Sequence, residues 1–458
     1  MFALKPTAEA CLWAGRPVQL RVIFSKANFG TLSTSLAIQA CGVCTGVVTA
    51  RLLGPVARGE LATVILWPTV LSNLGLMGCN WALAREVAKD PARESDWATG
   101  GLAVGLGTAL FYFLAGYLLM PWMLSRDKAF LLPLARLCLL LIPLDIFNQV
   151  LLSIEHGRMR WRRYNLWRLS FFAFYAGLIL LIGITHKGGV RLFVSAFLAG
   201  HLLTVLVRFW IQKRTLVAGR FHFGKCRHLL KAGIPYFGAT ASNLISLQLD
   251  KILVVSLLST DAAGIYAVAA TFASGQFSLG DALGITSFAV VSNEKDSGSQ
   301  QKIITETFRQ SALVSSGAAL VLAGLIPFLV QPLFGFEFSR AIWPAVVLAL
   351  AGSLTTSANI LNQGLRGAGR PHAGVLSQLA GTAVMGVAAW LLLRRFGLMG
   401  MACAVLLGGC TQVLSLVAAA ANWLGISPLQ FWPFGVKNVG LFLEQAANLR
   451  LRYSRSLT

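Results

Sequence analysis

The sequence predicts an all-α polytopic membrane protein with about twelve transmembrane helices, arranged as two pseudo-symmetric six-helix bundles around a central cavity. Of its 458 residues, 56% are hydrophobic and 12% are charged, whereas soluble proteins carry about 25% charged residues. The mean hydropathy is +0.69. One crossing takes about 20 apolar residues, so twelve crossings take roughly 240 and leave about half the chain for connections. A water-soluble fold is therefore excluded.

Twelve apolar runs of spanning length follow one another along the chain. Charged residues or glycine and proline separate them, beginning with Arg51 and the pair Gly54-Pro55 between the first two runs. Glycine and proline also make the exact ends uncertain by a few residues. The runs lie at about 29–50, 61–82, 99–124, 129–153, 166–185 and 190–212, and then at 232–258, 264–290, 310–333, 341–365, 372–394 and 397–422.

The distribution of positive charge predicts the orientation. The chain has 39 Lys and Arg against 17 Asp and Glu, a net charge of +22. With a cytoplasmic N-terminus, most basic residues fall on cytoplasmic connections, as the positive-inside rule requires. An even number of crossings places both termini in the cytoplasm of a multi-pass protein of the bacterial inner membrane. Orientation accounts for the excess charge, so we expect no nucleic-acid partner.

The two sets of six runs resemble copies of each other. Leu52-Leu53-Gly54 followed by Gly59 corresponds to Leu257-Leu258-Ser259 followed by Gly264, an offset of 205 residues. Six crossings per copy leave both halves in the same orientation, related by an axis along the membrane normal with the binding site between them. The predicted domains are a cytoplasmic N-terminal leader (1–28), an N-terminal bundle (29–212), a cytoplasmic hinge linker (213–231), a C-terminal bundle (232–424) and a cytoplasmic amphipathic tail (425–458).

Five charged residues lie well inside the predicted spans, away from their ends. A charge facing lipid at mid-membrane costs about 2.5–3.5 kcal/mol, so such residues normally face a cavity or a partner. One interpretation is that Asp250 and Lys251 pair with polar neighbours and hold helices together. The other is that all five serve the transported molecule or a coupling ion. The five residues are Arg136, Asp145, Asp250, Lys251 and Asp281.

Polar residues at helical spacing support the second interpretation. Residues three and four apart share one helix face, and six of the predicted spans carry such a polar stripe. Packing through small residues explains any single stripe, but six together favour a wet cavity for a hydrophilic molecule. The substrate-binding candidates are Arg136, Asp145, Asn148, Gln149, Asn243, Asp250, Lys251, Asp281, Asn359, Asn362 and Arg366, and the ion-coupling candidates are Asp145, Asp250 and Asp281.

Motifs of soluble enzymes fail in their context. Gly219-x-x-x-x-Gly224-Lys225 imitates a phosphate-binding loop, but Cys226 stands where Ser or Thr would hold Mg²⁺. His222, Cys226 and His228 have the spacing of metal ligands without a fourth partner. The other cysteines mostly lie in apolar runs and do not indicate a disulfide framework. We therefore expect no catalytic residues, no cofactor and no metal.

Several connections resemble the polysaccharide transporter branch of the MOP flippase superfamily. They lie at residues 50–62 (ARLLGPVARGELA), 247–251 (LQLDK) leading to 263–266 (AGIY), 362–370, and 396–402. The similarity covers about residues 28–422. It implies twelve helices in two bundles around a V-shaped cavity. It also implies movement of undecaprenyl-diphosphate-linked sugar repeats across the inner membrane by alternating access.

The leading hypothesis is therefore a flippase for lipid-linked oligosaccharide in exopolysaccharide or O-antigen assembly, working within the bilayer and alongside a polysaccharide polymerase and export machinery. Sugars need hydroxyl and amide partners, and a diphosphate needs cations such as Arg136 and Lys251, with Arg51 or Arg366. The alternatives are a multidrug or metabolite antiporter of the related MATE branch and a membrane polysaccharide polymerase. The sequence leaves open the sugars, the coupling ion, the pathway and the oligomeric state.

Overall fold

The computed structural model describes residues 26–185, 188–217, 219–294 and 296–433. Within these ranges the chain forms α-helices and short 3-10 segments and no strand. Most of the predicted leader and the end of the predicted tail lie outside the described residues. The α-helices are α3 (Lys26–Gly75), α4 (Cys79–Lys89), α5 (Glu94–Met123), α6 (Leu132–Cys138), α7 (Leu141–Gly157), α8 (Trp161–Thr185), α9 (Val190–Val217), α10 (Phe223–Leu257), α11 (Thr260–Asn293), α12 (Ser297–Phe334), α13 (Ile342–Gly367) and α14 (Pro371–Leu424).

Two of the helices are long enough to cross a membrane twice. α3 has 50 residues and α14 has 54, which at 1.5 Å per residue exceeds twice the 30 Å of a hydrocarbon core. Each is interrupted by a glycine with positive φ: Gly54 (φ 67°, ψ 178°) in α3 and Gly397 (φ 54°, ψ −130°) in α14. These backbone conformations suit glycine because they place a Cβ in a steric clash. Each long helix thus supplies two predicted crossings.

The described residues contain eight stretches long and apolar enough to span a membrane, and α3 and α14 account for two of them. Counting these two twice, and adding α10 (35 residues) and α11 (34 residues), gives the twelve predicted crossings. The predicted fold class, an all-α polytopic membrane protein, is confirmed.

The structure breaks two predicted runs into pieces. The run predicted at 61–82 stops at Gly75, because Met77 (φ 46°) and Gly78 (φ 71°) turn the chain before α4. The run predicted at 129–153 is divided into α6 and α7. Pro143, two residues into α7, has no N–H to bond the carbonyl of Leu139, and the chain turns at Leu139 and Leu140.

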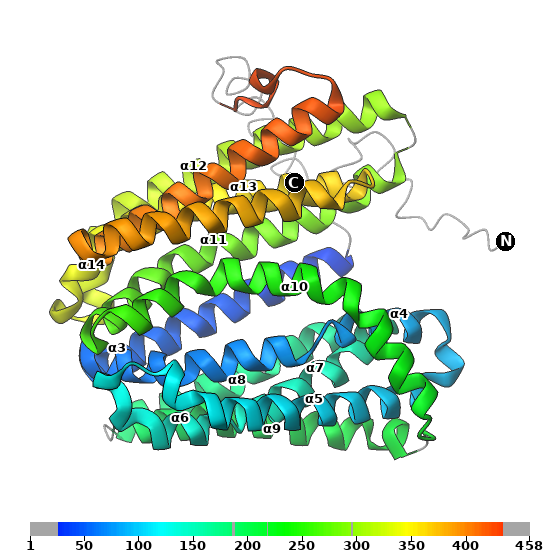
Figure 1. Ribbon diagram of the computed structural model, residues 1–458, viewed down its shortest axis with the longest axis horizontal. Coiled ribbons are helices and arrows are strands. Elements are labelled where there is room, and N and C mark those ends of the chain that lie inside the picture. The colour runs from blue at the N-terminus through cyan, green and yellow to red at the C-terminus, as the bar shows by residue number, and fades with distance from the viewer. Residues whose placement is uncertain (1–25, 186–187, 218, 295, 434–458) are drawn as a thin grey trace, which may run out of the picture.

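The helices form two lobes with separate apolar cores. Figure 1 shows α5 to α9 in the lower part of the molecule and α12 to α14 in the upper part, with α3, α10 and α11 between them. One core draws on buried residues between Leu61 and Leu229. A second centres on residues between Val254 and Ala404. The domain boundaries remain a prediction, since α10 contacts both lobes: Lys225 and Cys226 reach α5, and Asn243 contacts α14.

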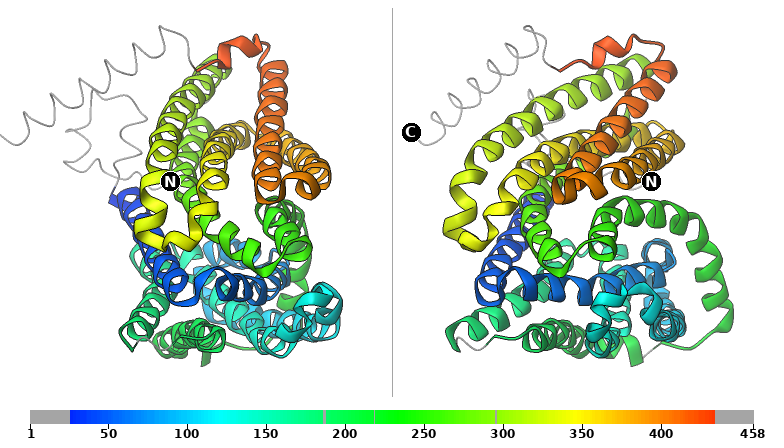
Figure 2. Two further views of the ribbon diagram at one scale, coloured as in Figure 1. Left: turned by 90° about the vertical axis from the view of Figure 1, so that its left-hand side faces the viewer. Right: turned by 60° about the vertical axis from the view of Figure 1, so that its left-hand side comes forward.

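The lobes meet at the end of the molecule where α3 bends, which we call the Gly54 end; the opposite end, which carries α4, is the α4 end (Figures 1 and 2). A Cβ on Gly59 would lie 1.7 Å from the carbonyl oxygen of Thr260, and a Cβ on Gly264 would lie 1.9 Å from that of Pro55. Gly59 and Gly264 are related by the 205-residue offset of the repeat, and so are Pro55 and Thr260. The contact is therefore reciprocal, as a two-fold axis between the lobes requires.

Two N-lobe cations reinforce this closure by donating to the ends of C-lobe helices. Arg51 Nε donates to the carbonyl of Leu333 at 2.8 Å, and its Nη2 donates to that of Pro332, both in the last turn of α12. The buried Lys128 Nζ donates to the carbonyls of Leu258, at 2.6 Å, and Val255 at the end of α10. The last carbonyls of a helix lack intrahelical partners and carry partial negative charge, so both cations are well placed.

Candidate functional site

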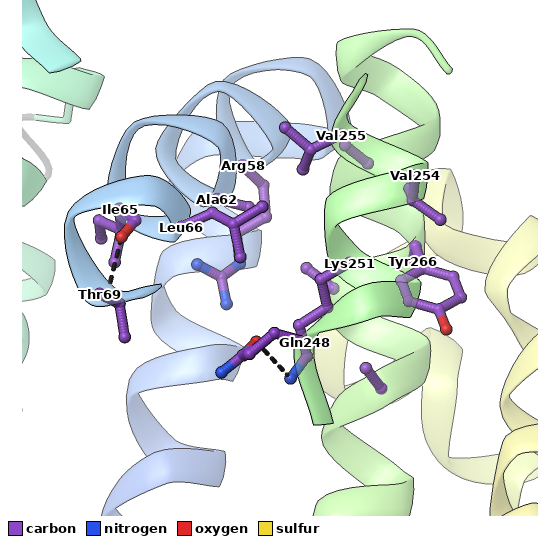
Figure 3. Close-up of a pocket in the computed structure, with 13 residues that line it drawn as sticks. Arg58, Ala62, Ile65, Leu66, Thr69, Gln248, Lys251, Val254, Val255 and Tyr266 are labelled. Atoms are coloured by element: carbon purple, nitrogen blue, oxygen red, sulfur yellow. Dashed lines mark hydrogen bonds between the residues drawn. The ribbon is translucent and has the colours of Figure 1, made fainter. Parts of the chain in front are cut away.

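A cavity of about 280 Å³ lies between the lobes, near the Gly54 end. The second half of α3 forms one wall, and α10 and α11 form the other (Figure 3). Most of the wall is aliphatic, and the polar groups are few. The lining residues are Arg58, Ala62, Ile65, Leu66, Thr69, Gln248, Lys251, Val254, Val255, Ala263, Tyr266, Ala267 and Ala270.

Two cations from opposite walls define the chemistry of this cavity. Lys251 Nζ donates to Gln248 Oε1 at 3.1 Å and to the carbonyl of Leu247 at 3.2 Å, both on its own helix. Arg58 comes from α3, and its buried Nε has no hydrogen-bond partner among the described residues. In the described part of the chain neither cation forms an ion pair with a carboxylate. The cavity therefore presents two positive charges, which favour an anionic ligand.

Asp250 stands beside Lys251 but pairs with a different partner. Its Oδ2 accepts a hydrogen bond of 2.8 Å from the hydroxyl of Tyr266, which lines the cavity from α11. Asp250 Oδ1 is buried without a partner among the described residues. Asp250 and Lys251 thus do pair with polar neighbours, as the first interpretation of the sequence holds. Lys251 also faces the cavity, as the second requires.

The other sequence candidates lie away from this cavity. Arg136 lies over the ring of Tyr117 at 4.3 Å. Asn243 Oδ1 accepts a hydrogen bond from Gln378 Nε2 at 3.0 Å, between α10 and α14. Asp145, Asn148 and Gln149 lie on α7 in the N-lobe, and Asn359, Asn362 and Arg366 lie on the α4-end half of α13. The side chain of Asp281, on α11, lies outside the described residues.

Sequence reasoning missed Arg58, Gln248 and Tyr266. Arg58 was placed in the connection between the first two runs, whereas the structure begins the second part of α3 at Pro55. Proline at a first helical position is a start signal, and it would have put Arg58 on the first turn of a helix. Gln248 and Tyr266 lie within the sequence segments of the family resemblance, but nothing in their spacing marked them as cavity residues.

A second polar region lies inside the N-lobe. Ser72 Oγ on α3 donates to Asp145 Oδ2 on α7 at 2.7 Å. Arg208, near the end of the run predicted at 190–212, is 4% exposed inside α9. Its Nη1 donates to the carbonyl of Asn148 at 2.8 Å. A position near the end of an apolar run does not by itself reveal which way the side chain points.

The first turns of α10 contact the N-lobe at the α4 end. Lys225 Nζ donates to Asp96 Oδ2 at 2.6 Å, and Cys226 Sγ donates to the carbonyl of Gly100 at 3.7 Å. His228 Nε2 lies 3.6 Å from Glu86 Oε1. Within the described residues no three His, Cys, Asp or Glu side chains come together as a metal site, and the described cysteines are free.

Comparison with known proteins gives one family and one fold. The family described as polysaccharide biosynthesis protein matches residues 25–275, more than half of the chain. The chain is 26% identical over 337 residues to the succinoglycan biosynthesis transport protein ExoT of Rhizobium meliloti (strain 1021). That match covers 70% of this chain and 65% of the relative, so this chain spans somewhat less than two thirds of the relative's length.

Solved structures share the fold at low sequence identity. The lipid II flippase MurJ in an inward closed conformation superposes with a TM-score of 0.71 at 13% identity, covering 91% of this chain and 92% of MurJ. A multidrug resistance MATE family transporter of the MOP superfamily in an inward-facing conformation also gives 0.71, at 12% identity, covering 89% of this chain and all of the transporter. An outward-facing MATE conformation gives 0.65 at 14% identity, with 89% and 98% coverage.

Proposed function

The chain belongs to the polysaccharide biosynthesis protein family, and from this premise we propose that it is an inner-membrane flippase that moves undecaprenyl-diphosphate-linked oligosaccharide repeat units for exopolysaccharide or O-antigen assembly. The observation that carries the proposal is the cavity between the lobes, with Arg58 and Lys251 on opposite walls. Two cations without carboxylate partners suit a diphosphate. No covalent bond is made or broken in such a transport cycle.

The position of the cavity suits alternating access. With both termini in the cytoplasm, the Gly54 end faces the periplasm, and the lobes are in contact there through Gly59 and Gly264. The cavity lies just inside this contact. In our proposal the substrate enters from the cytoplasmic leaflet, its diphosphate binds at Arg58 and Lys251, and separation of the lobes at the Gly54 end releases it outside. The lipid tail stays in the bilayer.

The remaining candidates have proposed roles in the same cycle. The amides Asn243, Asn359 and Asn362 and the cation Arg366 would contact sugar or phosphate when the lobes move, and so would Arg136, Asn148 and Gln149. Asp145, Asp250 and Asp281 are the proposed ion-coupling residues. A polysaccharide polymerase and export machinery are the proposed protein partners.

The positive charge of the cavity distinguishes a flippase from a MATE-type antiporter. The length of the connections between helices distinguishes a flippase from a polymerase. A cationic drug would be repelled by Arg58 and Lys251, since the cavity contains no carboxylate that pairs with either of them among the described residues. A polymerase needs room for a catalytic site outside the membrane. The connections at the Gly54 end are short, for example the two residues Leu258 and Ser259 between α10 and α11.

An accumulation assay in cells tests this function. A strain lacking the gene should retain undecaprenyl-linked repeats on the inner leaflet and lose surface polysaccharide, whereas loss of a polymerase would display single repeats outside. Lys251→Ala and Arg58→Ala should each reduce export about tenfold or more, because a charge-assisted hydrogen bond is worth about 1.5–3 kcal/mol. Lys251→Arg keeps the charge and should retain part of the activity.

Lys231→Ala is the matched control, because Lys231 is an exposed cation on the same helix α10 outside the cavity. It should export like the wild type. Membrane abundance and a single symmetric peak in size exclusion establish that each variant is folded. Full export by both Arg58→Ala and Lys251→Ala, or single repeats displayed outside by the deletion strain, would overturn the proposal.

A further inference from the structure

Four aromatic rings lie in contact at the α4 end of the N-lobe. His156, in the last turn of α7, has its ring centroid 5.7 Å from that of Trp81 on α4 and 5.7 Å from that of Trp161. The same imidazole stacks on Tyr164, with 5.1 Å between the ring centroids. Trp161 and Tyr164 belong to the first turn of α8 and meet edge to face at 6.0 Å. We call these four residues the aromatic row.

The aromatic row is only partly buried. Trp81 is 47% exposed and Trp161 is 38% exposed, although tryptophan is highly buried on average. Both indoles contact the same imidazole, so their exposed surfaces belong to one patch. An exposed apolar patch of this kind, rimmed by polar residues, marks an interaction site more often than a scattered hydrophobic residue does.

The exposed face of α4 points away from the lipid-facing side of the lobe. α4 packs on α5 through Leu83, on α7 through Ala84 and on α10 through Cys79. Its remaining face carries Trp81 and Arg85, which are one turn apart and both exposed. At helical spacing this face lies opposite α5. The exposed side chains of α5 between residues 106 and 119 are mostly apolar, as on a helix that contacts lipid.

The aromatic row extends across the N-lobe to the first turns of α3. Arg168 lies over the ring of Tyr164 at 5.8 Å, and its Nη2 donates to Ser35 Oγ on α3 at 3.5 Å. α3 in turn contacts the C-lobe, since a Cβ on Gly46 would lie 3.9 Å from the side chain of Thr271 on α11. Because α4 contacts α10 on the other side, the aromatic row lies on the side of the N-lobe that faces the C-lobe.

Arginines surround the aromatic row. Besides Arg168, they are Arg85 on α4 and the exposed Arg162 and Arg163 in the first turn of α8. Among the described residues none of the four forms an ion pair with a carboxylate. Each guanidinium has five N–H donors and cannot lose its charge. The row thus combines exposed ring faces with hydrogen-bond donors that no acid neutralises.

This combination favours a carbohydrate ligand. A pyranose ring has a face of C–H groups and an edge of hydroxyls. The face of an indole is apolar and carries partial negative charge, so it suits the C–H face of the sugar, while arginine donors suit the hydroxyl edge. Tryptophan and arginine also suit the surface of a bilayer, but the row is turned away from the lipid-facing helix α5 and toward the opposite lobe.

The aromatic row is separate from the cavity that contains Arg58 and Lys251. Between Ser35, beside the row, and Arg58, in the cavity wall, the chain of α3 rises by about 35 Å. A single sugar cannot contact both places at once. The row is therefore placed to meet sugars while the diphosphate is still at the cytoplasmic end.

We propose that the aromatic row, with Arg85 and Arg168, is an entry site that stacks the sugar rings of the lipid-linked oligosaccharide before its diphosphate reaches Arg58 and Lys251. The inference rests on the proposed function and its orientation, and it adds the group of residues that recognises carbohydrate. Binding at this site is non-covalent and requires neither lipid nor phosphate.

Saturation-transfer difference NMR of the full-length protein in lipid nanodiscs tests the site with a soluble probe. The probe is the mixture of oligosaccharides released by partial acid hydrolysis from the surface polysaccharide of the wild-type strain. Saturation of the protein should pass to the ring C–H protons of the sugar. Trp81→Ala and Trp161→Ala should each weaken binding about fivefold or more, because each removes one ring face. Trp81→Phe keeps an aromatic face and should retain part of the affinity.

Trp122→Ala is the matched control, because Trp122 is 80% exposed on α5 in the same lobe and lies outside the aromatic row. It should bind the probe like the wild type, and a single symmetric peak in size exclusion establishes that each variant is folded. Unchanged binding in both Trp81→Ala and Trp161→Ala would leave these rings as a membrane anchor only and would overturn the proposal. Absence of binding to the wild type would overturn it as well.

Lys251→Ala tests whether the row and the cavity are separate sites. This variant should bind the probe like the wild type while its export falls, and loss of the probe signal would overturn two separate sites. The proposed function is measured by accumulation of undecaprenyl-linked repeats, whereas this site is measured with a sugar that carries neither lipid nor phosphate. Row-dependent binding without an accumulation phenotype would therefore sink the proposed function alone, and the opposite result would sink the entry site alone.

Discussion

Glu86 shows how a single carboxylate connects the start of α10 to the N-lobe. Its side chain is 10% exposed and lies 3.1 Å from Lys89 Nζ on its own helix and 3.6 Å from His228 Nε2 on α10. Burial by itself raises the pKa of Glu86, but the hydrogen bonds and charges of Lys89 and His228 outweigh it, so the pKa lies below its ordinary value. The folded state therefore favours the ionised carboxylate.

We expect Glu86→Gln to lower the free energy of unfolding by about 0.5 kcal/mol at neutral pH, a small value because the side chains of Lys89 and His228 are both half exposed. A lowered carboxyl pKa contributes stability above the unfolded pKa of about 4.3, and this contribution is lost as the pH falls through the folded value. Thermal unfolding between about pH 3 and pH 8 should show the two proteins converging in acid. A constant difference across that range would contradict the assignment, and Glu306→Gln serves as the control.

Residue by residue, one of the sequence candidates lines the cavity, and other polar residues of its wall were not among them. Lys251 was expected at the cavity and lines it. Arg58 was missed because it was taken as part of a connection. Arg208, near the end of the run predicted at 190–212, was not among the candidates and is buried. Helical spacing shows which residues share a face, but the partner of that face depends on contacts between segments far apart in the chain, such as Arg208 with Asn148.

At the scale of the helices, hydropathy did not predict the glycine bends within the two longest helices. The apolar runs predicted α5, α8, α9 and α13 within about five residues at each end, since hydropathy determines where a chain can cross a bilayer. The run at 310–333 predicted the end of α12 but not its start, because the helix begins at Ser297 in a polar segment. Hydropathy does not distinguish a loop from a bend within one helix, so the continuity of α3 through Gly54 and of α14 through Gly397 was not predicted.

Gly397 offers a clean test of backbone strain in such an element. A Cβ there would meet no atom within 4 Å, so Gly397→Ala changes the backbone energy without a steric contact. This backbone conformation destabilises a residue other than glycine by about 1–3 kcal/mol. We expect Gly397→Ala to lower the free energy of unfolding by that amount. Gly425 (φ 67°, ψ 30°) is left-handed helical, a conformation that asparagine tolerates. Denaturant titration should therefore find Gly425→Asn close to wild type and Gly397→Asn as damaging as Gly397→Ala. Equal, small effects at both positions would argue against strain at Gly397.

At the scale of the whole molecule, residues that are equivalent under the sequence repeat lie in contact across the two lobes. The 205-residue offset pairs Pro55 with Thr260 and Gly59 with Gly264, and the structure brings these four residues together across the two lobes. Residues that the weak sequence repeat makes equivalent thus meet at the interface between the lobes, a contact that the repeat alone did not predict. It did not reveal that the interface closes one end of the cavity, because closure depends on the relative position of the lobes.

The symmetry of this interface predicts that equivalent substitutions in the two lobes have the same effect. An added methyl on Gly59 would lie 1.7 Å from the carbonyl oxygen of Thr260, and one on Gly264 would lie 1.9 Å from that of Pro55. Both contacts are with backbone, so the lobes must move apart, and overpacking of this kind typically costs about 1–3 kcal/mol. Gly59→Ala and Gly264→Ala should therefore both expose the cavity at the Gly54 end.

The measurement is the labelling of a cysteine at Ala62, in the cavity wall, by a membrane-impermeant maleimide added to intact cells. At a cost of about 1.4 kcal/mol to the closed state, the exposed population rises about tenfold, and labelling should rise with it. The parent without the cysteine at position 62 gives the background from the native thiols. Gly189→Ala is the matched control, since Gly189 lies at the same end and a Cβ there meets nothing within 4 Å. Because Gly59 and Gly264 are equivalent under the repeat, increased labelling in one variant and not in the other would mean that the two lobes do not share this interface as a symmetric gate.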